Sequence, residues 1–171
     1  YERTSRILEP LAAANPLDAE LQRASAFTLT TIGEIQNKLE RPSEAPVNHQ
    51  TALARIEKLR EADPADNFTP LAVAYVLNQL SDSQLQLGEY DAALRSLSEG
   101  NKILSGLPPA TPEDLTEVRM LPGLTYHRLA HVHAQLAKAQ SASARAREGH
   151  LRESREWARR ARDVFTPLTS D

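Results

Sequence analysis

Cysteine is missing from this chain of 171 residues. Without a thiol, the chain can form no disulfide, supply no thiolate nucleophile and hold no cysteine-ligated zinc. The absence does not identify a compartment, because a cysteine-free chain is compatible with both oxidising and reducing surroundings.

Long apolar runs and an excess of one charge are also missing. No run approaches the roughly 20 residues that a membrane-spanning helix needs, and the start has no signal-peptide character. The net charge is −3 and the pI is about 6.0, which gives no general attraction to nucleic acid or to anionic membranes. We therefore expect neither nucleic acid nor a membrane as a direct partner.

The arginine-rich C-terminal part agrees with that expectation. Its arginines are spaced for phosphate contacts, but acidic residues lie three or four positions from several of them, as on a solvated helix with many ion pairs. The arginines are Arg145, Arg147, Arg152, Arg155, Arg159, Arg160 and Arg162, and the acidic residues are Glu148, Glu153, Glu156 and Asp163.

Motifs of common catalytic sites are absent as well. There is no P-loop, no glycine-rich dinucleotide turn, no Gly-x-Ser-x-Gly and no set of kinase signatures. His127, His131 and His133 form H-x₃-H-x-H, and the first two have a spacing that can bind zinc on a helix. No carboxylate accompanies them on a neighbouring turn, so we expect no bound metal. Because the catalytic and cofactor motifs are missing, we also expect no cofactor and no catalysis. An enzyme on a helical scaffold stays open as an alternative.

A period of 48 residues runs through the chain. The form x-Pro-x-Asp occurs three times, and Pro16, Pro64 and Pro112 are 48 residues apart in both intervals. The apolar and small residues around it keep the same offset. The matching sets are Leu8, Ile56 and Leu104; Leu11, Leu59 and Leu107; Phe27 and Tyr75; Leu29 and Leu77; Ile32 and Leu80. We conclude that the chain is built from repeats.

Within each repeat the apolar spacing is helical, as at Ala52, Ile56 and Leu59. We predict an all-α protein with seven helices, over residues 1–14, 18–39, 44–62, 69–87, 90–106, 113–139 and 149–168. Thr69 and Thr111, each followed by proline, are predicted N-caps. Pro122 is expected to break the sixth helix, and the Ser141–His150 segment is expected to be a loop or a helix extension.

One repeat carries the clearest family pattern: Ala74-Tyr75-x-Leu77-x-x-Leu80-Ser81, then Leu87-Gly88-Glu89-Tyr90-Asp91-Ala92-Ala93-Leu94, then Leu97-x-x-Gly100. It resembles a tetratricopeptide repeat, although Glu40-Arg41-Pro42 replaces the Gly-x-Tyr corner in the preceding repeat. The resemblance implies a right-handed α-solenoid of antiparallel helix hairpins. It divides a single domain, 1–171, into a final helix of a truncated repeat (1–16) and repeats at 17–64, 65–111 and 112–171, the last with an insertion near 138–150.

The segments AELQRASAFTLTTIGEIQ and ALARIEKLREADPADN resemble the long repeats C-terminal to the kinase domain of many bacterial serine/threonine protein kinases. The resemblance implies a non-catalytic protein- or peptide-binding scaffold in a larger regulatory protein. The chain opens at Tyr1 within a helical pattern, so we expect a piece of a longer protein. We favour the cytoplasm, and an extracytoplasmic position stays open if a membrane span precedes this part.

The resemblance also implies where a partner binds. The concave face is expected to carry Phe27, Thr30, Glu34, Asn37, Tyr75, Asn78, Asp82, Leu85, Leu124, His127, His131 and Gln135. Aromatic and amide groups beside carboxylates suit an extended or helical peptide, with a bias toward basic segments. The two-carboxylate clamp of chaperone-binding members is not expected, because Thr30, Glu34 and Asn78 stand where lysine or arginine is required.

A structural role is the alternative. Ile7, Leu8 and Leu11 are expected to leave apolar surface at the open end of the array, where two copies could associate as a homodimer. For His127 and His131 we favour ordinary exposed or packed histidines, and a groove-lining pair that titrates near neutral pH stays open as an alternative.

Overall fold

The structure is a computed structural model that describes residues 1–66, 68–109, 111, 114, 116–139 and 143–168. These ranges form seven helices and no strand, which confirms the all-α prediction. The helices are α1 (Glu2–Ala14), α2 (Ala19–Lys38), α3 (Ala45–Ala62), α4 (Phe68–Gln86), α5 (Tyr90–Ser105), α6 (Thr116–Lys138) and α7 (Ala144–Leu168).

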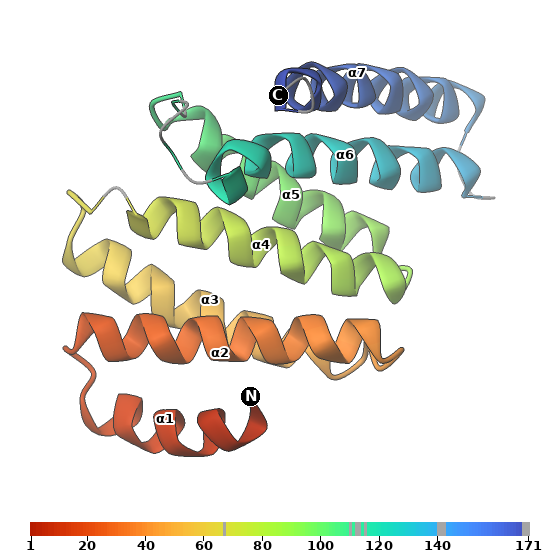
Figure 1. The fold of residues 1–171 in the computed structure, drawn as a ribbon. Coiled ribbons are helices and arrows are strands. Elements are labelled where there is room, and N and C mark those ends of the chain that lie inside the picture. The colour runs from red at the N-terminus through yellow and green to blue at the C-terminus, as the bar shows by residue number, and fades with distance from the viewer. Residues whose placement is uncertain (67, 110, 112–113, 115, 140–142, 169–171) are drawn as a thin grey trace.

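The helices stack in chain order from α1 at one end to α7 at the other (Figure 1). Each packs on the next, and the pairs α2–α3, α4–α5 and α6–α7 form hairpins. Contacts also join α2 to α4 and α4 to α6, whereas α3 and α5 do not touch within the described residues. Helices α2, α4 and α6 therefore lie side by side as one layer. We call the open side of this layer the even-helix face.

One backbone hydrogen bond recurs at all three x-Pro-x-Asp segments. The Asp18 N–H donates to the Asn15 carbonyl, the Asp66 N–H to the Asp63 carbonyl, and the Asp114 N–H to the Thr111 carbonyl, each at 3.2 Å. The 48-residue period of the sequence is thus also a period of the backbone hydrogen bonds.

The prediction of Thr69 as an N-cap was wrong. Helix α4 begins one residue earlier, at Phe68, and the Asp66 carboxylate accepts from the Phe68 N–H at 2.9 Å and the Thr69 hydroxyl at 2.6 Å. These bonds, the Thr69 bond foremost, lower the pKa of Asp66. Asp18 is the N-cap of α2, and its carboxylate accepts from the Leu21 N–H at 3.0 Å. The predicted cap at Thr111 depends on Pro112, which lies outside the described residues.

The corners inside the first two hairpins also match. Gly88 has φ +76°, and Glu40, 48 residues earlier, has φ +58°. The Glu89 N–H donates to the Gln84 carbonyl at 2.8 Å, and the Arg41 N–H donates to the Gln36 carbonyl at 2.9 Å. Helices α2 and α4 thus end in the same left-handed turn. In the first hairpin a glutamate adopts a conformation that costs glycine much less.

Small and branched apolar side chains fill the space between the helices. One apolar cluster joins the first two hairpins and contains Ala26, Leu29, Ala52, Ile56, Leu59, Ala72, Val73, Val76 and Leu77. A second cluster joins α5 to the last hairpin and contains Ala93, Leu97, Leu129 and Val132. Trp157 of α7 packs against this second cluster and stacks on Tyr126, with 5.4 Å between ring centroids.

Two boundaries differ from the sequence prediction. Pro122 does not break α6, which runs from Thr116 through the proline to Lys138. A proline removes one backbone hydrogen bond, and packing of the preceding turn through the buried Leu121 can offset that loss. Helix α7 begins at Ala144, earlier than predicted, so the described part of the inserted segment extends a helix.

Candidate functional site

Two adjoining pockets lie on the even-helix face. The first, which we call the aromatic pocket, has a volume of about 280 Å³ and is lined by Phe27, Thr31, Phe68, Leu71, Ala72, Tyr75, Glu117, Val118 and Leu121. The second, the polar pocket, has a volume of about 310 Å³ and is lined by Glu34, Asn37, Lys38, Gln79, Asp82, Gln86 and Arg128. All three helices of the layer contribute to both.

The aromatic pocket keeps two large apolar side chains partly in solvent. Phe27 of α2 is 38% exposed and Phe68 of α4 is 48% exposed, with 6.2 Å between their ring centroids. Leu121 of α6 is buried. Exposed aromatic rings around a hollow of this size leave apolar area that a ligand side chain can cover.

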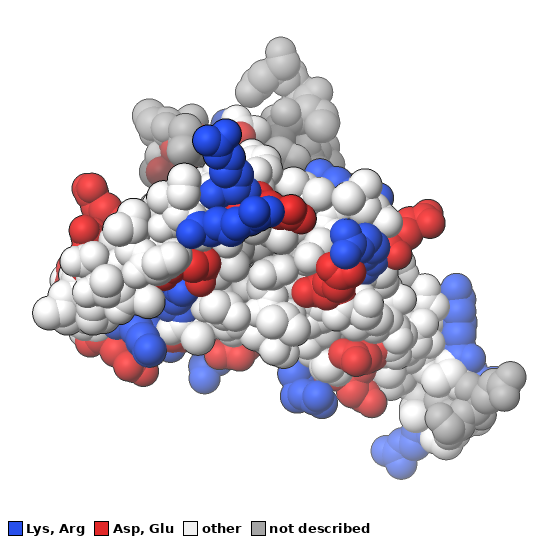
Figure 2. All heavy atoms as spheres, turned by 90° about the horizontal axis from the view of Figure 1, so that it is seen from below, with Lys and Arg blue, Asp and Glu red and all other residues white. Residues whose placement is uncertain are grey.

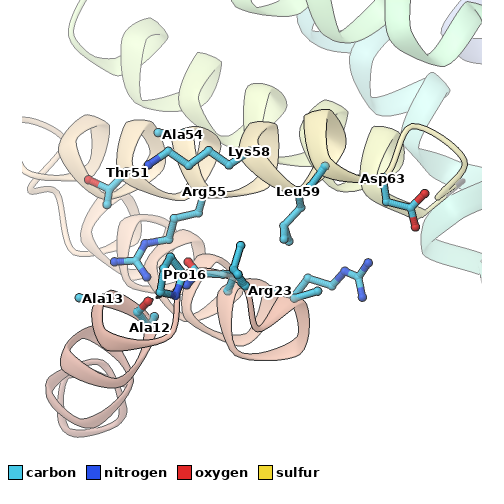
Figure 3. Close-up of a pocket in the computed structure, with 14 residues that line it drawn as sticks. Ala12, Ala13, Pro16, Arg23, Thr51, Ala54, Arg55, Lys58, Leu59 and Asp63 are labelled. Carbon is cyan, nitrogen blue, oxygen red and sulfur yellow. Dashed lines mark hydrogen bonds between the residues drawn. The ribbon is translucent and has the colours of Figure 1, made fainter.

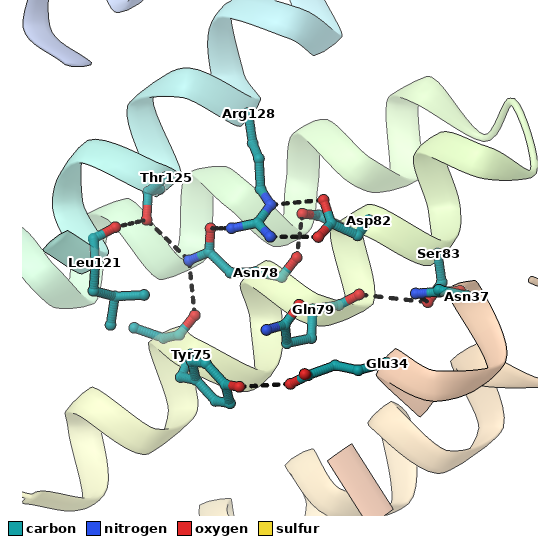
Figure 4. A network of polar contacts seen from close by, with 12 residues as sticks. Glu34, Asn37, Tyr75, Asn78, Gln79, Asp82, Ser83, Leu121, Thr125 and Arg128 are labelled. Carbon is teal, nitrogen blue, oxygen red and sulfur yellow. Dashed lines mark hydrogen bonds and ion pairs between the residues drawn. The ribbon is translucent and has the colours of Figure 1, made fainter. Parts of the chain in front are cut away.

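The polar pocket is held together by side chains that bridge the helices (Figure 4). Arg128 of α6 makes a two-pronged ion pair with Asp82 of α4, with 2.6 Å from Nε to Oδ1. Asn37 of α2 donates to the Ser83 hydroxyl of α4 at 2.9 Å. Because charged bidentate pairs fix geometry as well as contribute energy, these bonds hold the three helices at a set spacing.

Tyr75 connects the two pockets. Its ring lines the aromatic pocket, and its hydroxyl donates to Glu34 Oε1 in the polar pocket at 2.5 Å (Figure 4). Burial, and next the bond to Glu34, raise the pKa of Tyr75 to about 12. The phenol therefore stays protonated near neutral pH and keeps donating to the carboxylate.

Two of the predicted contact residues are buried. Thr30 is 0% exposed, and its hydroxyl donates to the Ala26 carbonyl at 2.8 Å. Asn78 is 1% exposed and donates to the Ala74 carbonyl and to the Thr125 hydroxyl, each at 2.9 Å. Their predicted place on an open groove was wrong: they lie between helices, where their hydrogen bonds satisfy buried polar groups.

The predicted row on the third repeat is shifted. Thr125 and Arg128 of α6 face Asn78 and Asp82, in the places expected for His127 and His131. Both histidines are exposed, and the side chains of His131 and Gln135 lie 2.8 Å apart on consecutive turns. Neither histidine lines the two pockets, and neither do Gln135 and the half-buried Leu124. The sequence offset alone could not set this rotation of α6.

Leu85 also lies elsewhere than predicted, because it packs against the apolar cluster between α5 and the last hairpin. Five predicted residues line the two pockets: Phe27, Glu34, Asn37, Tyr75 and Asp82. The structure adds Phe68, Leu121, Lys38 and Arg128, among others. Leu71, Phe68 and Gln79 are four, seven and four positions from Tyr75, a helical spacing that could have marked them on the same face.

A larger hollow of about 640 Å³ lies at the α1 end of the molecule and is lined mainly by α1, α2 and α3 (Figure 3). Alanines form much of its lining, together with Arg23, Arg55 and Lys58. Arg23 pairs with Asp66, and Arg55 pairs with Glu9 at 2.6 Å. The first pair connects α2 to the turn before α4, and the second connects α3 to α1, so the hollow offers no unpaired guanidinium group among its described lining residues.

Histidines occur at two further places. His49 of α3 is 0% exposed, and its ring lies against Gly33 of α2. Neither ring nitrogen has a hydrogen-bond partner among the described residues, and burial lowers its pKa to about 4. His133 of α6 and His150 of α7 lie with their Nδ1 atoms 3.0 Å apart, and burial, with the neighbouring ring, lowers the pKa of His133.

The described residues contain no group of three or more histidine, aspartate or glutamate side chains placed to hold a metal ion. Within the same ranges, no helix is both long and apolar enough to cross a membrane.

Comparisons of the chain with the models of known protein families, with curated proteins and with solved structures find no match. The tetratricopeptide resemblance therefore stays a prediction from the residues quoted above.

Proposed function

We propose that this chain is a non-catalytic, peptide-binding scaffold of the tetratricopeptide type, with its binding surface on the even-helix face. The observation that carries the proposal is the pair of adjoining pockets across α2, α4 and α6. An aromatic hollow beside a polar one offers a peptide both apolar contact and hydrogen-bonding partners.

Rigidity of the surface supports this function. Ion pairs and hydrogen bonds join α2 to α4 and α4 to α6 on the edge of the polar pocket. A surface that is already ordered loses little conformational entropy when a ligand binds, which favours affinity for a short segment. In the cell we place this scaffold within a larger regulatory protein, such as a bacterial serine/threonine kinase.

A twelve-residue random peptide library, displayed on phage and selected against the chain, tests the proposal. Selected peptides are then synthesised and titrated into the isotopically labelled chain. We expect NMR shift changes to concentrate on α2, α4 and α6, and Phe68→Ala to weaken binding about tenfold. The control is Val47→Ala, which removes an apolar side chain that is 64% exposed on α3. A library without binders, or peptides indifferent to Phe68→Ala, would contradict the proposal.

Self-association is a second candidate, favoured by exposed apolar residues on α1. Ile7 is 56% exposed and Leu11 is 47% exposed. Seen from the α1 end, the molecule shows broad uncharged surface with acidic and basic residues scattered over it (Figure 2). Sedimentation of the chain across a hundredfold concentration range tests this role. A mass that stays monomeric would exclude it, and a dimer that Ile7→Glu dissociates would support it.

A further inference from the structure

We propose that the ligand of the even-helix face is a peptide with one bulky apolar side chain and a lysine or arginine within about four positions of it. This inference rests on the proposed function and adds the chemistry of the segment. The apolar side chain would occupy the aromatic pocket, and the basic side chain would reach Glu34.

The aromatic pocket suits a single anchor. Its lining is apolar apart from Thr31, the Tyr75 hydroxyl and Glu117, and its volume of about 280 Å³ fits one aromatic or branched aliphatic side chain. The Phe27 and Phe68 rings are large apolar parts of this lining that solvent reaches. A ligand ring or methyl group packed against both rings would be removed from water together with their exposed faces, and that burial is the main gain in free energy.

The charges beside the pocket favour a cation. Of the acidic residues that line the two pockets, Asp82 is neutralised by Arg128. Glu34 and Glu117 have no ion-pair partner among the described residues, and Glu34 accepts the Tyr75 hydroxyl bond at Oε1. Unpaired carboxylates are complementary to an ammonium or guanidinium group.

The cations of the same surface do not reverse this preference. Arg128 is committed to Asp82 and donates to Asn78 at 3.3 Å. Lys38 lies on the last turn of α2, at the edge of the polar pocket. An acidic peptide would therefore meet two unpaired carboxylates near the anchor and one lysine at the far edge.

The distance between the aromatic pocket and the Glu34 carboxylate determines how far apart the apolar and basic residues of the ligand are expected to be. Glu34 is hydrogen-bonded to the Tyr75 hydroxyl, so the carboxylate lies directly beside the aromatic pocket. Tyr75 and Asp82 are two turns apart on α4, or roughly 10 Å. An extended peptide covers that span in about three residues, and a long basic side chain can shorten it. A basic residue within about four positions of the apolar anchor can thus reach Glu34 from within the polar pocket.

The test uses the peptides selected from the random library. Each is resynthesised with its bulky apolar residue changed to alanine, and separately with its nearest basic residue changed to glutamine. We expect about tenfold weaker binding for the first change and about three- to tenfold for the second, with the second effect decreasing as salt is added.

Variants of the chain complete the test. Glu34→Gln with Glu117→Gln should weaken a basic peptide about three- to tenfold and leave its glutamine-substituted form unchanged. The matched control is Glu20→Gln with Glu99→Gln, which removes two charges from α2 and α5 outside both pockets. Glutamine at position 34 can still accept the Tyr75 bond, so the fold is expected to persist, and a thermal melt checks it.

The outcomes separate this inference from the proposed function. Peptides that need Phe68 but carry no basic residue, or that ignore the two glutamate changes, would overturn the inference alone. Peptides that bind without any dependence on Phe68 would overturn both. Selection of acidic peptides that need Phe68 would overturn the inference that the ligand is basic. It would still support binding at the even-helix face.

Discussion

The first hairpin, α2–α3, and the second, α4–α5, come from segments 48 residues apart and have the same turns, yet they differ in how well their residues suit the fold. The second has Gly88 at the left-handed corner and a fully buried Leu97. The first has Glu40 at that corner and His49, equally buried, at the matching position. The repeat backbone therefore tolerates an unfavourable corner and a buried imidazole when the surrounding contacts persist.

In the first hairpin, Gly33 leaves the space that the buried His49 ring occupies. A Cβ atom on this residue would lie 2.5 Å from the His49 ring, so the ring occupies the space that a side chain would need. The second hairpin has Ser81 and Leu97 at the two matching positions, both 0% exposed. The two hairpins thus fill corresponding space with different pairs of residues. The first uses Gly33 with the His49 ring, and the second uses Ser81 with the Leu97 side chain.

The largest effect is expected from Leu97→Ala. Leu97 is 0% exposed and belongs to the cluster that joins α5 to the last hairpin, so its truncation leaves a cavity. We expect a loss of about 3 kcal/mol in the free energy of unfolding, measured by urea denaturation. Val47→Ala, at an exposed site on α3, should change it by less than about 0.5 kcal/mol. Equal losses for the two variants would contradict the assigned core.

His49 should make the free energy of unfolding depend on pH. Burial in the folded protein lowers its pKa to about 4, below the ordinary value of 6.5. Above pH 6.5 the ring is neutral in both states. As the pH falls from 6.5 to 4, the unfolded chain binds a proton that the folded chain does not, so stability decreases. The loss across this window is roughly 3 kcal/mol.

His49→Leu is the control for that measurement, since it places an aliphatic chain where the second hairpin has one. Urea denaturation at several pH values between 7 and 4 should show a shallower decrease for this variant. Parallel curves for the two proteins would show that the imidazole is not buried in its neutral form.

Gly33→Ala should destabilise the first hairpin by about 2 kcal/mol, because the added methyl group overlaps the His49 ring. Gly149→Ala is the matched control. This glycine lies in α7, and an added methyl group there would have no heavy atom within 4 Å apart from its chain neighbours and its own helix backbone. That change should stabilise the protein by about 0.5–1 kcal/mol. Thermal denaturation of the two variants should therefore shift in opposite directions.

The smallest effect concerns the two corners. Glu40→Gly should stabilise the protein by roughly 1 kcal/mol, because glycine adopts a positive φ without the Cβ penalty. Gly88→Ala should cost a similar amount through the backbone alone, since no heavy atom lies within 4 Å of the added methyl group. If both changes were neutral, the left-handed geometry of the corners would be wrong.

Local patterns predicted much of the fold. The proline and aspartate positions marked the turns, and helical apolar spacing marked the helices within a few residues. The residues that line the two pockets were predicted less well. Phe27 and Tyr75 were placed correctly on one surface because they share a repeat position. Asn78 was expected in the open, but its amide closes a bond between α4 and α6.

The errors have a common physical cause. Pro122 was expected to end a helix on its intrinsic cost of about 3 kcal/mol, a cost that tertiary packing can offset. His127 and His131 were assigned by an offset in sequence, whereas the rotation of α6 depends on which side chains pack against α4. The ion pair from Arg128 to Asp82 shows the rotation that the packing selected.

The helices, their order and the period of their turns follow from the amino-acid sequence read locally, because those features depend on residues close together in the chain. Tertiary packing settled which polar residues are buried between helices and which line a pocket. That choice depends on the rotation and spacing of α2, α4 and α6, which arise from contacts between residues far apart in the chain, such as Glu34 with Tyr75 and Asp82 with Arg128. The adjoining pockets, with Tyr75 between them, are a product of that packing.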